Sequence, residues 1–97
     1  MTLHTVNLLP DHPDCRRCIR QLAPGDAVIF LGRGVWIANA RAAWLPDWEV
    51  DGVALHVLND DLAASGLAGQ RAPSVALLDL PGFVALTEQH TVQRAWF

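Results

Sequence analysis

The sequence predicts an α/β protein built on a mostly parallel β-sheet with helices packed against it. Short apolar runs alternate with helix-like segments along the chain, which is typical of this class. Two of the runs, residues 27–31 and 74–80, are almost continuously apolar, as expected of strands that are covered on both faces. The segments between runs are long enough to hold a helix, so they indicate right-handed crossovers between parallel strands.

The first strand and the first helix are expected near the N-terminus. The strand covers residues 3–9 and is closed by Pro10, because proline cannot donate a ladder hydrogen bond. A helix over residues 15–23 follows a polar loop. Asp14 is a suitable N-cap for this helix, and Pro24 with the glycine after it stops the helix.

The middle of the chain alternates in the same way. The strand at residues 27–31 is followed by Gly32-Arg33-Gly34. We interpret these as turn residues, because the rest of a dinucleotide-binding fingerprint is missing. A helix over residues 34–44, ended before Pro46, and a third strand over residues 53–58 are then expected.

Four further elements complete the prediction: a helix over residues 60–65, a strand over 74–80, a helix over 83–89 and a short strand over 91–97. Gly66 is the type of residue that commonly ends a helix. Pro81 stands at a helix start, where its missing N–H leaves no bond unmade. Residues 1–97 are therefore expected to form a single domain.

The composition argues against nucleic acid and membrane as partners and favours a partner protein. The formal net charge is -3, all 7 cationic residues are arginines and most are scattered, so no basic stripe for nucleic acid is expected. No apolar run reaches the ~18 residues that a membrane span needs. A hydrophobic fraction of 52% is high for 97 residues, and we expect some of this surface to contact a partner protein. The N-terminal residues lack a basic region leading into an apolar stretch, so we expect no signal peptide and a cytosolic location.

Cys15 and Cys18 form a C-x-x-C pair at the start of the expected helix. Cytosolic cysteines are normally reduced, so these two are candidates for chemistry rather than for a structural disulfide. A helix N-terminus stabilises thiolates, and Arg16, Arg17 and Arg20 add cationic charge nearby. We therefore expect a lowered thiol pKa, which a nucleophile or a persulfide carrier needs. Cys18 is the main candidate and Cys15 the weaker one; alternatively, either is a small buried apolar residue.

Three chemistries fit this spacing. Thiol–disulfide exchange uses both cysteines, and sulfur carriage uses one; the spacing does not choose between them. A metal site would add His12 as a ligand, but a second pair of ligands is missing, so no metal is expected. The lone histidines His4 and His56 are expected to be hydrogen-bonded residues of strands rather than general bases.

Several separate blocks of residues, in the same order, resemble the DsrH/TusB family. They are Leu3-His4-Thr5-Val6-Asn7 with Pro10, Gly25-Asp26 before Val28-Ile29-Phe30-Leu31, and the run from Leu58 to Leu67. The most specific block is the last one, where Gly82-Phe83-Val84-x-Leu86-Thr87 is followed by Gln93-x-Ala95-Trp96-Phe97. The resemblance covers nearly the whole chain.

The resemblance implies a compact three-layer α/β fold with a five-stranded, mostly parallel sheet. It also implies a subunit of a hetero-oligomeric sulfurtransferase (sulfur-relay) complex. The implied partners are DsrE/TusD-type and DsrF/TusC-type subunits and a DsrC/TusE-type sulfur acceptor. Sulfur travels between them as a cysteine persulfide, with no cofactor and no direct contact with nucleic acid or membrane. The TusB branch serves 2-thiolation of the tRNA wobble uridine, and the DsrH branch serves dissimilatory sulfur oxidation.

Two features point to different branches of the family. Cys18 lies seven residues before Gly25, where DsrH-type members carry a cysteine, whereas the Gln93-x-Ala95-Trp96 spacing is more similar to the TusB branch. Cys15 is not part of the family pattern. The main expectation is that Cys18 carries persulfide sulfur. The alternatives are a non-catalytic scaffold subunit and a thioredoxin-like oxidoreductase that uses Cys15 with Cys18.

Overall fold

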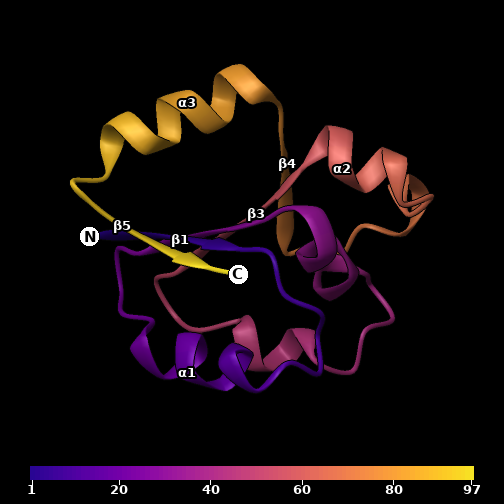
Figure 1. Cartoon of the computed structure of the whole chain (residues 1–97), viewed down its shortest axis with the longest axis horizontal. Helices are drawn as coiled ribbons and strands as arrows, with labels where there is room; N and C mark the ends of the chain where they lie inside the picture. Colours follow the sequence, from indigo (N-terminus) through magenta and orange to yellow (C-terminus); the bar gives the residue numbers. More distant parts are fainter.

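The computed structural model describes all residues 1–97 and contains a five-stranded sheet in which every neighbouring pair of strands is parallel. The strands are β1 (Thr2–Val6), β2 (Ala27–Phe30), β3 (Ala54–Leu58), β4 (Val75–Leu78) and β5 (Val92–Trp96), in the order β4-β3-β2-β1-β5. The expected α/β class is confirmed, and the sheet is wholly rather than mostly parallel. The chain builds outward from β1 to β4 and then returns, so that β5 lies beside β1 (Figure 1).

Helices cover both faces of this sheet. They are α1 (Pro13–Gln21), α2 (Asn59–Ala64), α3 (Leu80–Gln89) and the 3₁₀ helices η1 (Gly32–Ala38), η2 (Leu45–Trp48) and η3 (Ala68–Gln70). Figure 1 shows α1 below the strands and α3 above them, which gives three layers. A bilayer-crossing helix would have to be longer and more apolar than any of these.

The two faces carry cores of very different size. Alternate residues of a strand point to opposite faces, so His4 and Val6 of β1 face α1 while Leu3 faces α3. The core on the α1 face contains 17 buried residues, and the one on the α3 face contains 5. In the larger core, Phe30 meets the edge of Trp48 with ring centroids 5.1 Å apart. Any group held in the larger core is therefore fixed from all sides.

The expected helix over residues 34–44 is wrong. The chain forms η1 and η2 instead, joined by turns. Gly34 packs so closely on β1 that an added Cβ would collide with the Val6 carbonyl oxygen. The segment that follows then pairs with a distant one, since Asn39 forms a bridge with Arg71. This pairing holds the backbone extended and ends η1 early.

Element boundaries near the N-terminus also differ from expectation. The first strand ends at Val6, three residues before the expected end at residue 9. Helix α1 begins at Pro13, and its N-cap is His12, whose Nδ1 accepts a hydrogen bond from the Asp14 N–H at 3.0 Å. Asp14, expected as the cap, therefore lies in the first turn.

Candidate functional site

Cys18 lies on the inward side of α1 and is fully buried in the larger core. Its Sγ is 3.9 Å from Nδ1 of His4, a residue of the neighbouring strand β1. A thiol and an imidazole this close form a donor–acceptor pair, since neutral imidazole has one nitrogen that accepts. Cys18, the main candidate from the sequence, therefore lies beside a side chain that can accept its proton.

His4 is itself fully buried and makes two further hydrogen bonds. Its Nε2 is 3.1 Å from Oδ2 of Asp26, and its Nδ1 is 3.2 Å from the indole Nε1 of Trp96. An indole N–H can only donate, so Nδ1 is the accepting nitrogen and Nε2–H donates to the carboxylate. The two rings also stack, with centroids 6.4 Å apart and planes at 27°.

Asp26 immediately precedes β2 and anchors this arrangement from the sheet side. Its carboxylate accepts hydrogen bonds from the Thr2 N–H at 2.9 Å and the Ala23 N–H at 3.1 Å, besides that from His4. Burial alone would raise the pKa of this carboxyl, but the bonds from Thr2, His4 and Ala23 outweigh burial and lower the pKa. Asp26 is thus an ionised acceptor of three hydrogen bonds, one of which fixes the His4 ring.

The expected thiolate at Cys18 is contradicted by its surroundings. Burial, and then the neighbouring Cys15 and Asp26, raise the pKa of the Cys18 thiol to about 12. The arginines do not reverse this, because they lie on the outer side of α1. Arg17 is 73% exposed and pairs with Asp14 at 3.5 Å. Cys18 is therefore a neutral thiol in this conformation.

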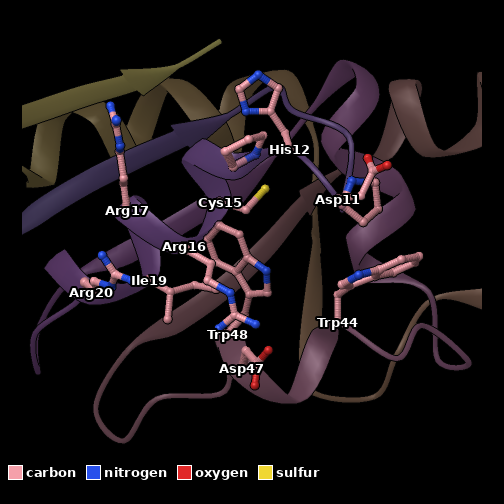
Figure 2. Close-up of a pocket in the computed structure, with 12 residues that line it drawn as sticks. Asp11, His12, Cys15, Arg16, Arg17, Ile19, Arg20, Trp44, Asp47 and Trp48 are labelled. Carbon is pink, nitrogen blue, oxygen red and sulfur yellow. The ribbon is translucent and has the colours of Figure 1, made fainter.

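Cys15 lies at a surface pocket rather than in the Cys18–His4 cluster. The pocket has a volume of about 450 Å³, and Figure 2 shows the Cys15 sulfur in the midst of its lining residues. Arg16, Arg17 and Arg20 all line it, but Cys18 does not. The structure thus brings the three expected arginines to Cys15, the weaker candidate, and leaves Cys18 apart from them.

The Cys15 thiol is also held neutral. Its Sγ donates to the Leu9 carbonyl oxygen at 3.4 Å. Burial, followed by the negative charges of Asp11 and Asp14, raises its pKa. Both cysteines are free thiols. The expectation of a lowered thiol pKa is therefore wrong at both positions.

A metal site built on the C-x-x-C pair would need His12 as a further ligand. In the structure His12 caps α1 through its Nδ1, and Cys15 and Cys18 face different surroundings. Nowhere do three His, Cys, Asp or Glu side chains gather in a way that could hold a metal ion.

The sequence did not single out His4, Asp26 or Trp96 as partners of Cys18. His4 and Asp26 are 22 residues apart, and His4 and Trp96 are 92 residues apart, so no local spacing connects them. Only the order of the strands in the sheet could have indicated that these residues lie together. A C-terminal strand placed beside β1 brings Trp96 level with Val6, two residues from His4.

Comparison with known proteins gives a consistent result. The family model described as "DsrH like protein" matches residues 10–93. The Protein TusB of Klebsiella pneumoniae is 39% identical over 94 residues, which cover 97% of this chain and 99% of that protein. The Protein TusB of Escherichia coli K12 is 35% identical with the same coverage.

A solved structure agrees at the level of the fold. The solution NMR structure of Protein Tm0979 from Thermotoga maritima superposes with a TM-score of 0.69 at 24% identity, covering 92% of this chain and 93% of that one. The match to the family model over most of the chain, and relatives above 30% identity over nearly its full length, lead to one conclusion: the chain belongs to the DsrH family.

Proposed function

We propose that this chain is a subunit of a cytosolic sulfur-relay complex that passes persulfide sulfur toward a DsrC/TusE-type acceptor. DsrE/TusD-type and DsrF/TusC-type chains are its partners in this proposal. The observation that carries it is the end-to-end match with relatives named TusB, 97% of this chain against 99% of theirs. Those names favour 2-thiolation of the tRNA wobble uridine over sulfur oxidation.

The distribution of exposed apolar side chains supports a role as a subunit. Leu9, Trp36 and Trp44 are 45%, 46% and 47% exposed and border one shallow cavity of about 350 Å³. Exposed tryptophans are enriched at protein interfaces, where they supply much of the binding free energy. We name Leu9, Trp36 and Trp44 the tryptophan surface and propose that it contacts a partner subunit.

The protonation of the two thiols indicates whether this chain or a partner subunit handles sulfur first. Both are neutral as the isolated chain stands, and a neutral thiol is a poor nucleophile. This favours a resting subunit in which sulfur is first handled by a cysteine of a partner. It also speaks against a thioredoxin-like oxidoreductase, which needs one cysteine of the pair to be readily ionised.

Assembly tests the proposal directly. Co-expression of this chain with DsrE/TusD-type and DsrF/TusC-type subunits should give one complex in size-exclusion chromatography. Trp44→Glu places a charge in the tryptophan surface and should abolish co-elution, whereas Leu80→Glu on α3 should leave it intact. Leu80 is a matched control because it is an exposed apolar residue at 54% exposure on the opposite face.

The outcomes separate the parts of the proposal. Failure of the wild-type chain to co-elute would contradict the subunit role itself. Co-elution of Trp44→Glu together with loss of Leu80→Glu would place the interface on the α3 face instead. Sulfur transfer is then followed by intact mass of each subunit after incubation of the complex with glutathione persulfide. The acceptor should gain one sulfur atom that dithiothreitol removes.

A further inference from the structure

We propose that Cys18, His4 and Asp26 form a nucleophile–base–carboxylate array for sulfane sulfur, which Trp96 keeps at rest by occupying the base. The substrate class, a persulfide, rests on the proposed function. The array itself, and the hydrogen bond by which Trp96 occupies His4, rest on the geometry alone. Cys18 is the catalytic nucleophile, His4 is the proton acceptor and Asp26 is a positioning residue.

The connectivity of the atoms matches what activated nucleophiles require. Cys18 Sγ faces one ring nitrogen of His4 at 3.9 Å, and the other ring nitrogen donates to Asp26 at 3.1 Å. This is the order in which a base takes a proton from a nucleophile while a carboxylate orients the base. The three groups come from α1, β1 and the start of β2, and all three are buried.

Asp26 is held in place by backbone hydrogen bonds as well as by His4. Its two backbone bonds, from Thr2 and Ala23, leave Oδ2 fixed toward His4. An ionised carboxylate beside Nε2–H holds the tautomer in which Nδ1 presents its lone pair. It would also stabilise the imidazolium that forms when Nδ1 takes a proton.

Trp96 competes with Cys18 for that lone pair. The indole N–H lies 3.2 Å from His4 Nδ1, while the sulfur lies 0.7 Å farther away. An imidazole nitrogen has one lone pair in the ring plane, so it accepts one good hydrogen bond at a time. With the indole in place, the His4 lone pair is taken and the thiol has no free acceptor for its proton on that ring.

Trp96 is also the one member of this cluster that is not buried. It belongs to β5, an edge strand that pairs only with β1, and the other four residues of β5 are exposed. Edge strands present unpaired backbone groups to incoming partners. A partner that pairs with β5 or pulls on it would withdraw the indole, free His4 Nδ1 and open a path to the sulfur.

The transfer step then balances without an oxidant. His4 Nδ1 takes the proton of Cys18, and the thiolate attacks the outer sulfur of a donor persulfide, R–S–SH. The bond between the two donor sulfurs breaks as the bond between Cys18 Sγ and the outer sulfur forms. The products are the Cys18 persulfide and R–S⁻, which takes the proton back from the imidazolium.

The test titrates Cys18 directly in the full chain. Cys15→Ser leaves one thiol, and the chain has no tyrosine, so the ultraviolet absorbance gained on raising the pH reports the Cys18 thiolate alone. Trp96→Phe removes the indole N–H and keeps an aromatic ring in place. We expect the apparent pKa of Cys18 to fall by at least about one unit, which is tenfold more thiolate at a given pH below it.

Two further variants separate proton acceptance from loosening of the fold. Phe97→Leu alters the next residue, which is 72% exposed, and should leave the titration unchanged. His4→Gln keeps a donor toward Asp26 but removes the nitrogen that faces Cys18, so Trp96→Phe should no longer lower the pKa in this background. Unfolding free energies are measured for every variant.

The array is overturned if Trp96→Phe leaves the titration where it was, if Phe97→Leu shifts it equally, or if the shift persists with His4→Gln. Each of these outcomes concerns the isolated chain, so the subunit role tested by co-elution would stand. Conversely, loss of co-elution in the wild type would leave this titration result untouched.

Discussion

The two faces of the sheet treat a buried histidine ring nitrogen in opposite ways. On the α1 face, His4 has a partner at both ring nitrogens, Asp26 at one and Trp96 at the other. On the α3 face, the buried Nδ1 of His56 has no hydrogen-bond partner. Its neighbour His90 uses its own Nδ1 to donate to the Leu86 carbonyl oxygen at 2.9 Å.

The difference follows from the packing around each histidine. The core on the α1 face has 17 buried residues, and the rigid surroundings of His4 hold its partners at hydrogen-bonding distance. The core on the α3 face has 5, and two apolar residues of α3, Leu80 and Val84, stay exposed. Defined polar geometry is thus found where packing is deepest, which is also where the candidate site lies.

Truncating one aromatic residue on each face should give the largest difference in unfolding free energy between the two faces. Trp48→Ala removes a fully buried ring from the larger core and should cost about 3–5 kcal/mol of unfolding free energy. Phe83→Ala, on the partly buried side of α3, should cost clearly less, because the site is partly open and loses less burial. Chemical denaturation of both variants measures the two values.

Equal losses for Trp48→Ala and Phe83→Ala would break the comparison between the faces. They would mean that α3 contributes as much to global stability as the larger core does. The slope of the denaturation curve serves as the control, because a changed slope would show that one variant no longer unfolds in a single step.

Asp26→Asn should produce the next largest effect. The amide cannot replace an ionised acceptor for His4, Thr2 and Ala23, so we expect a loss of about 2–3 kcal/mol at neutral pH. The folded pKa of Asp26 lies below its unfolded value of about 3.9. Its contribution is therefore fully present above that value and is lost as the pH falls through the folded pKa.

The acid limb of the stability curve is the measurement for this variant. The gap in unfolding free energy between wild type and Asp26→Asn should close as the pH is lowered into the acid range. A gap that stays constant with pH would show that Asp26 acts through shape alone and not through its charge.

The fold was accessible from the sequence because its signals are local. Apolar runs at residues 27–31 and 74–80 gave β2 and β4 to within a few residues, and Pro81 marked the start of α3. The error came at η1, where a contact between Gly34 and the Val6 carbonyl oxygen decides the backbone. Such a contact between distant segments leaves no periodic trace in the sequence.

The candidate site was accessible only in part. The C-x-x-C spacing identified Cys18 and the family resemblance supported it, but the sign of its pKa shift was mispredicted from the helix N-terminus and the arginines. Those terms act in water-exposed surroundings, whereas burial of the sulfur dominates here. His4, Asp26 and Trp96 became partners only through the order of the strands, which places β5 beside β1.

The smallest expected effect concerns His56 on the thin face. Burial and the proximity of His90 lower the pKa of His56, so the folded chain resists its protonation while the unfolded chain does not. The contribution of neutral His56 to stability is thus fully present above its unfolded pKa of about 6.5 and declines as the pH falls from there toward the folded pKa.

Thermal unfolding is the measurement for this group. The melting temperature of wild type should drop by a few degrees across this window, and His56→Leu should reduce the drop. If His56→Leu melts with the same pH dependence as wild type, protonation of His56 has no bearing on stability, and the α3 face tolerates an unpartnered histidine nitrogen without cost.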